Sequence, residues 1–124
     1  MRRHGIILFG HGSRDPRWIE PFERLAERVR VSHTSGPVGL AFLELIPPEL
    51  KNAVADHVTA RCATVTIVPV FVGQGSHVRR DLPELVEACR AAHLGVEIRC
   101  ATAIGEEHSV LDAIAKYCLQ QACD

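Results

Sequence analysis

The sequence lacks an excess of either charge and lacks any long hydrophobic run. With 14 basic and 15 acidic residues, the 124-residue chain has a net charge of −1, so no basic excess is available to neutralise a nucleic-acid backbone. No apolar run approaches the roughly 20 residues needed to cross a bilayer. The run at residues 6–9 is too short for the core of a signal peptide. We therefore expect a cytoplasmic protein that binds neither nucleic acid nor membrane.

The cysteines lack the spacing of a disulfide framework or of a zinc-thiolate site. There are five of them, an odd number, and no two stand at C-x-x-C spacing. The nucleotide-binding signatures G-x-x-x-x-G-K-[ST] and G-x-G-x-x-G are also missing. We expect free thiols and no organic cofactor. Histidine, in contrast, is frequent, with seven in the chain.

Extended and helical patterns alternate along the chain. Short apolar and β-branched runs predict strands at 5–10, 38–45, 63–72 and 96–101. Apolar residues at helical spacing predict helices from 16 to about 35, from 49 to 60, from 82 to 93 and from 106 to 119. Asp15 is expected to cap the first helix. This order predicts a parallel sheet with helices on both faces, and the length suits a single domain, 1–124.

Ligands of open α/β sheets bind at the carboxyl ends of the strands, where this sequence places two imidazoles and a carboxylate. His11 follows the first predicted strand, Glu44 lies at the end of the second, and His77 follows the third. Neutral imidazole is a good ligand for cobalt, iron and nickel, and it accepts a proton near neutral pH. Two imidazoles and a carboxylate would hold a metal ion transiently, whereas a closed four-ligand cage would not pass it on.

Three segments at these strand ends carry a family resemblance. They are residues 8–14 (LFGHGSR), 41–45 (AFLEL) followed by Pro47-Pro48, and 68–83 (VPVFVGQGSHVRRDLP). Together they resemble the small sirohydrochlorin chelatases of the class II group, the CbiX type. The resemblance implies a flavodoxin-like, three-layer αβα domain with a four-stranded parallel sheet, which pairs as a homodimer. It also implies insertion of a divalent metal, Co²⁺ or Fe²⁺, into sirohydrochlorin on the way to siroheme or cobalamin.

The resemblance assigns roles to individual residues. His11 and His77 match the metal-binding histidines of the family and Glu44 matches its acidic residue, so these three are the expected catalytic and metal-binding groups. The histidines would take the two inner protons of the macrocycle, and Glu44 would be a third ligand or a partner of one histidine. Sirohydrochlorin carries many carboxylates, which suit arginine forks and backbone N–H groups near helix starts. The expected substrate-binding residues are Ser13, Arg14, Ser76, Arg79 and Arg80.

Several alternatives stay open. A nickel chelatase acting on a related tetrapyrrole shares the motifs, and a non-catalytic metal or tetrapyrrole carrier fits the same residues. The Arg79-Arg80 pair is also consistent with two solvent-exposed arginines at the start of a helix that bind no ligand. The other histidines, at 4, 33, 57, 93 and 108, are expected outside the site. Arg3-His4-Gly5 matches the signature of histidine phosphatases, but it precedes the first strand and so lies at the wrong edge of the sheet.

Overall fold

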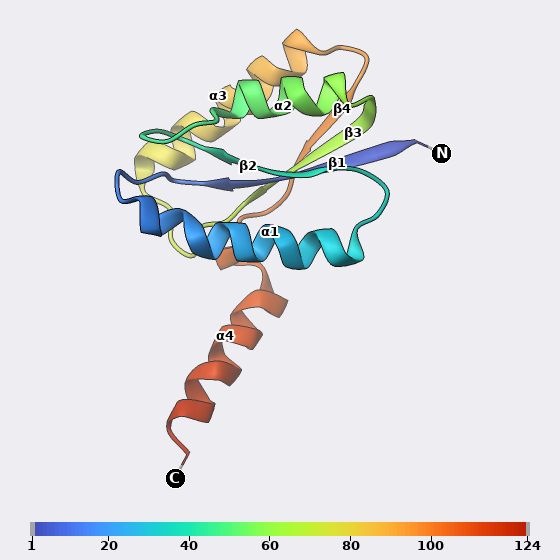
Figure 1. Ribbon diagram of the computed structural model, residues 1–124. Coiled ribbons are helices and arrows are strands. Elements are labelled where there is room, and N and C mark those ends of the chain that lie inside the picture. The colour runs from blue at the N-terminus through green and yellow to red at the C-terminus, as the bar shows by residue number, and fades with distance from the viewer. Residues whose placement is uncertain (1, 124) are drawn as a thin grey trace.

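The computed structural model describes residues 2–123, which form a parallel sheet between helices (Figure 1). The strands are β1 (Arg3–Gly10), β2 (Val38–Phe42), β3 (Cys62–Pro69) and β4 (Glu97–Cys100). The helices are α1 (Glu20–Ser32), α2 (Leu50–Thr59), α3 (Ser76–Ala92) and α4 (His108–Gln121), with 3₁₀ turns η1 (Pro16–Ile19) and η2 (Ile104–Glu106). The four strands pair in parallel in the order β2-β1-β3-β4. The predicted α/β fold is confirmed.

The core lies on both faces of the two central strands. Alternate residues of β1 and β3, including Ile7, Phe9 and Ile67, are fully buried under α2 and α3. On the opposite face, Leu8 packs with Ala26 of α1 and with Val38. Burial on both faces explains why these strands appear in the sequence as nearly continuous apolar runs.

Two predicted strands end earlier than their apolar runs do. β2 stops at Phe42 rather than at residue 45, because the next amides bond to the loop after β1 and Leu45 has a positive φ of 72°. β3 stops at Pro69 rather than at residue 72, and the carbonyl of Phe71 accepts a hydrogen bond from Gly105 N instead. In both places, backbone hydrogen bonds made by the following loop replace the regular hydrogen bonds between neighbouring strands.

The helix predicted from residue 82 begins at Ser76, so that prediction is wrong by a turn and a half. Pro83 lies inside α3. An internal proline costs about 3 kcal/mol. Burial of four apolar side chains on one face of α3 offsets that cost. They are Val78, Leu82, Val86 and Cys89. At the first helix, Asp15 caps as predicted, accepting a hydrogen bond from Arg17 N at 2.9 Å, although the first turn is 3₁₀.

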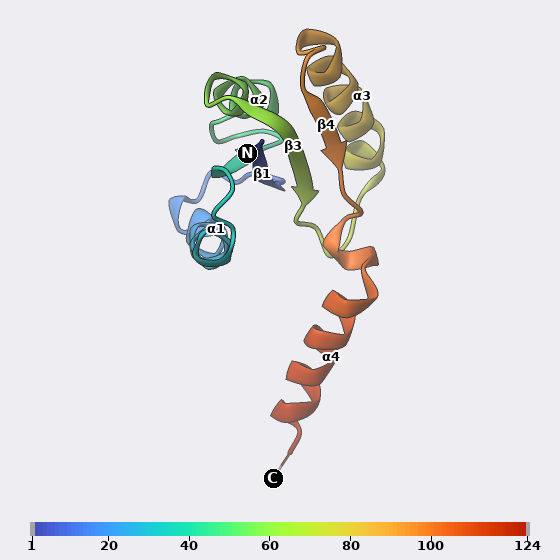
Figure 2. The same cartoon turned by 90° about the vertical axis from the view of Figure 1, so that its right-hand side faces the viewer.

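The last helix does not cover the sheet. α4 leaves the carboxyl edge through η2 and extends away from the body (Figures 1 and 2). Over residues 2–123, no helix is long and apolar enough to span a bilayer. The five cysteines, all within that part of the chain, are free.

Candidate metal-insertion site

The loops after β1 and β2 are joined by backbone hydrogen bonds at the carboxyl edge of the sheet. The amide of Leu43 donates to the Gly10 carbonyl at 3.0 Å, and the amide of Glu44 donates to the His11 carbonyl at 3.2 Å. Gly12, in the loop after β1, has a φ of 102°. A Cβ at this position would collide with the Glu44 carbonyl oxygen. Only glycine fits this close approach without strain. The backbone therefore holds Glu44 beside His11.

The side chains of His11 and Glu44 meet at this junction. The Nε2 atom of His11 lies 3.5 Å from the Oε1 atom of Glu44, and each side chain is about half exposed. The buried ring of Phe71 stands edge-on to the imidazole, with ring centroids 6.4 Å apart. One side of the imidazole is thus supported by the core, and the other remains open to a ligand.

His77 lies on the first turn of α3 rather than in a loop. Its Nδ1 atom is 3.2 Å from the Oδ2 atom of Asp81, which stands four residues further on. In the tautomer with the proton on Nδ1, which faces this carboxylate, Nε2 carries the lone pair and is the atom available to a metal ion or a proton. Sequence reasoning missed Asp81. The i, i+4 spacing would have indicated it if the helix start had been placed at Ser76.

Two adjoining cavities flank Glu44. One, of about 400 Å³, is lined by Leu43, Glu44, His77, Asp81, Glu84 and Leu85. The other, of about 460 Å³, is lined by Leu43, Glu44, Leu45, Ile46, Pro47 and Glu49. Glu44 therefore contacts the His11 imidazole and also faces the cavity of His77. The three residues predicted to share a site do lie at one edge of the sheet.

This site is open rather than a closed cage. Among residues 2–123, no three histidine, cysteine, aspartate or glutamate side chains form a ready-made metal site. The structure instead presents two separate pairs, His11 with Glu44 and His77 with Asp81. Separate pairs suit an ion that must enter and leave, since a closed tetrahedral set is the form that structural metal sites take.

The predicted substrate-binding residues lie in the loop after β1 and at the start of α3. Arg14 is exposed in the loop after β1, and Ser76, Arg79 and Arg80 are exposed on the first turn of α3. Arg80 contacts the Asp81 carboxylate at 3.5 Å, so it is not entirely free. The arginines remain accessible to an anionic ligand.

Ser13 has a structural partner. Its Oγ atom accepts a hydrogen bond from the amide of Asp15 at 3.1 Å, which shapes the turn before η1. The hydroxyl therefore has one lone pair engaged in the turn, while its hydrogen stays free to donate.

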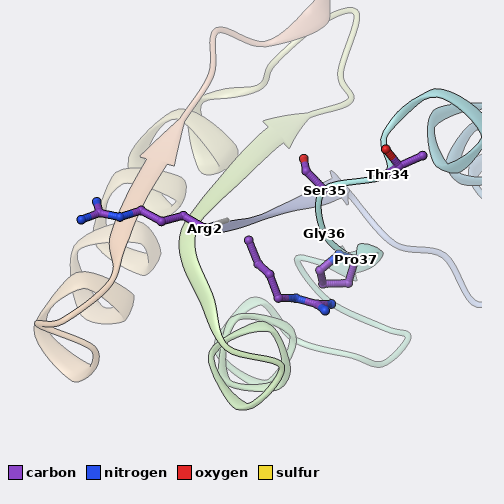
Figure 3. Close-up of a pocket in the computed structure, with 6 residues that line it drawn as sticks. Arg2, Thr34, Ser35, Gly36 and Pro37 are labelled. Carbon is purple, nitrogen blue, oxygen red and sulfur yellow. The ribbon is translucent and has the colours of Figure 1, made fainter.

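The opposite edge of the sheet holds a different cavity. It measures about 290 Å³ and is lined by Arg2, Arg3, Thr34, Ser35, Gly36 and Pro37 (Figure 3). Nearby, His4 Nε2 bonds Thr66 Oγ1 at 2.6 Å and His33 Nε2 bonds the His4 carbonyl at 2.6 Å. These histidines hold the fold together at the amino end of the strands. The phosphatase-like signature is therefore far from the carboxyl edge, as expected.

Comparison with known proteins identifies the family of the chain. The family model described as CbiX matches residues 5–121. The chain belongs to the CbiX family. Over 81 residues it is 33% identical to the sirohydrochlorin cobaltochelatase of Methanopyrus kandleri, which covers 65% of this chain. The chain spans 57% of the length of that relative.

Solved structures of related proteins match over almost all of the chain. The CbiX protein from Marinobacter aquaeolei VT8 superposes with a TM-score of 0.82 and 37% identity, covering 96% of this chain and 97% of that one. The sirohydrochlorin chelatase SirB from Bacillus subtilis subspecies spizizenii, solved with cobalt, superposes with a TM-score of 0.78 and 21% identity. That match covers 92% of this chain and 49% of SirB. The chelatase-like fold is thereby confirmed.

Proposed function

We propose that this CbiX protein is a chelatase that inserts a divalent metal ion into a sirohydrochlorin-type tetrapyrrole. The observation that carries the proposal is the position of Glu44, which lies 3.5 Å from His11 and lines one cavity with His77 at the carboxyl edge of the sheet. Sirohydrochlorin cobaltochelatases among the relatives favour cobalt as the metal. Iron and nickel are the alternatives that a two-imidazole site also accepts.

The geometry supports a stepwise role for the three side chains. The Nε2 atoms of His11 and His77 and the Glu44 carboxylate would bind the incoming ion as a substrate. As the ion enters the macrocycle, two inner N–H protons must leave, and the two imidazoles are the bases placed to accept them. Release follows because a protonated imidazole no longer has a lone pair for the metal. Arg14, Arg79 and Arg80 would hold the peripheral carboxylates of the macrocycle.

We further propose that the working form is a homodimer. The chain matches about half of SirB, so a second copy would supply what the other half of the longer chain supplies. The two cavities beside Glu44 open at the edge of the sheet, so they can cover only one side of a flat macrocycle. A second copy facing this edge would cover the other side.

Absorbance spectroscopy of sirohydrochlorin tests the proposal. The chain is mixed with excess sirohydrochlorin and Co²⁺, and Fe²⁺ and Ni²⁺ are measured in parallel. We expect many turnovers per chain above the spontaneous rate, fastest with Co²⁺. A change that stops at one equivalent per chain would indicate a carrier and contradict the proposal. Faster turnover with Ni²⁺ would reassign the metal while keeping the reaction.

A further inference from the structure

The turn η2 lies against the loop that follows β3, although none of its residues lines the two cavities beside Glu44. The amide of Gly105 in η2 donates a hydrogen bond to the Phe71 carbonyl at 2.9 Å. A Cβ on Gly105 would collide with the Val72 carbonyl oxygen, so the two backbones can approach this closely only because residue 105 has no side chain. The contact fixes the backbone of Phe71 and Val72 at the carboxyl edge of the sheet.

The side chain that this contact fixes is the ring beside His11. The centroid of the Phe71 ring lies 6.4 Å from that of the His11 imidazole, with 81° between the ring planes. On the core side, Phe71 packs edge-on against the fully buried ring of Phe9, with centroids 5.9 Å apart. Aromatic rings favour edge-on contacts at such distances. Phe71 therefore connects a rigid ring of the core with an imidazole at the surface.

The His11 side chain has little other support. It is 48% exposed, and the polar side chain that faces it is Glu44, whose Oε1 atom lies 3.5 Å from Nε2. That distance is longer than an effective hydrogen bond, so Glu44 alone does not fix the imidazole. An exposed side chain without a fixed partner samples several rotamers, and ordering it when a ligand arrives costs free energy. The packing of the imidazole on Phe71 reduces this cost.

We propose that Phe71 is a positioning residue for His11, and that Gly105 acts by holding Phe71 in place. This inference rests on the proposed chelatase function, in which Nε2 of His11 binds the incoming ion and accepts a proton. The Phe71 ring fills the space on the core side of the imidazole, so the imidazole stays on the side of Glu44. Correct placement of a reacting group matters because a misplacement of 1 Å can cost about 100-fold in rate.

His77 provides an internal control because its support is different. Its Nδ1 atom lies 3.2 Å from the Asp81 carboxylate within the same helix, α3. The loop that separates it from Phe71 contains Gly73 and Gly75, whose Cβ positions meet nothing within 4 Å. A change of the Phe71 side chain should therefore leave the mobility of the His77 imidazole as it is.

NMR relaxation of the imidazole carbons in the metal-free protein tests the positioning without any measurement of activity. In Phe71→Leu, the order parameter of the His11 imidazole should fall to that of a flexible group, about 0.6 or less, while that of His77 stays at its wild-type value. Phe71→Met is the second variant if Phe71→Leu does not keep native circular dichroism. An unchanged order parameter for His11, or an equal fall for both histidines, would overturn the proposal.

Steady-state rates of Co²⁺ insertion into sirohydrochlorin then measure the consequence for the reaction. Phe71→Leu should lower kcat by about 10-fold or more and change KM for sirohydrochlorin by less than about twofold, because positioning of His11 affects the reaction and not the binding of the macrocycle. Val65→Ala is the control, since Val65 is also fully buried in β3 and its truncation lowers stability alone. Equal kcat values for Phe71→Leu and Val65→Ala would contradict the proposal.

A double-mutant cycle tests the role of Gly105. Gly105→Ala should lower kcat and the His11 order parameter as Phe71→Leu does, and combining the two substitutions should lower kcat no further than the more severe single substitution. Fully additive effects would show that Gly105 does not act through Phe71. If the wild-type protein shows no turnover, the proposed chelatase function fails, and the order parameters still decide whether Phe71 positions His11.

Discussion

The Nδ1 atom of His77 lies 3.2 Å from the Oδ2 atom of Asp81, one helical turn further along α3. Partners of this kind fix the orientation and tautomer of a ligating imidazole, and losing them typically weakens metal binding 10- to 100-fold. We expect Asp81→Asn to weaken Co²⁺ binding by about that factor. Calorimetric titration of the metal-free protein with Co²⁺ measures it. Glu84→Gln, which alters the same cavity, should have a smaller effect, and equal effects would argue against positioning by Asp81.

Glu44→Gln keeps the size of the side chain and removes its charge beside His11. If Glu44 is a ligand or a partner of His11, chelatase activity with Co²⁺ should fall by about 10-fold or more, or the order of metal preference should change. Initial rates with Co²⁺, Fe²⁺ and Ni²⁺ measure both outcomes. Glu87→Gln is the matched control, because Glu87 pairs with Arg90 further along α3. Rates like those of the control would remove Glu44 from the mechanism.

Gly12→Ala tests whether the backbone holds Glu44 in place. Gly12 has a φ of 102°, and an added Cβ would meet the Glu44 carbonyl oxygen. We expect a loss of about 1–3 kcal/mol in the free energy of unfolding. We also expect a larger fractional loss of activity than the loss of folded protein explains. Gly95→Ala is the control, since nothing lies within 4 Å of its Cβ position. Equal stability of the two variants would contradict the account of this junction.

His57 makes stability depend on pH. Its side chain is 6% exposed, and among the described residues its Nδ1 has no hydrogen-bond partner. Burial lowers the pKa of His57 below its ordinary value of 6.5, with Asp56 acting weakly in the opposite direction. The native state therefore stays neutral where the unfolded chain already binds a proton. The free energy of unfolding should fall as pH drops below 6.5, by at most about 1.4 kcal/mol per pH unit for this one proton.

Urea unfolding between pH 5 and 7.5 measures this dependence. His57→Leu should make the acid side of the curve less steep, because one residue that takes up a proton on unfolding is gone, while His4, whose pKa burial also lowers, remains. His108→Gln removes an exposed histidine and should leave the curve unchanged. Parallel curves for wild type and His57→Leu would show that another group is responsible.

The alternating pattern was sufficient to predict the α/β class, the four strands and the edge of the sheet at which His11, Glu44 and His77 lie. Buried strands and amphipathic helices leave strong periodic signals, and residues that follow parallel strands meet at the carboxyl edge. The order β2-β1-β3-β4 was not predicted, because periodicity shows which face of an element is apolar and not which neighbour it meets. The same limit applies to α4, whose apolar face was visible in the sequence while its direction was not.

The details of the site were harder to predict, because they depend on tertiary contacts. The sequence predicts this helix from residue 82, but packing of the buried face of α3 carries the helix through Pro83 from Ser76. That shift moved His77 from a loop onto a helix and hid its pairing with Asp81. Hydrogen bonds between loops, such as the one from Glu44 N to His11 O, have no periodic signal in the sequence.

Turnover by two histidine variants tests the central claim most directly. His11→Ala and His77→Ala are compared with His93→Ala and with wild type, using multiple-turnover Co²⁺ insertion into sirohydrochlorin. Both site histidines are about half exposed, so all variants should keep native circular dichroism and thermal midpoints. We predict that His11→Ala and His77→Ala each lose about 100-fold or more of the rate, since each removes a ligand and a base, and that His93→Ala keeps it. Near-normal turnover in both site variants would contradict the account.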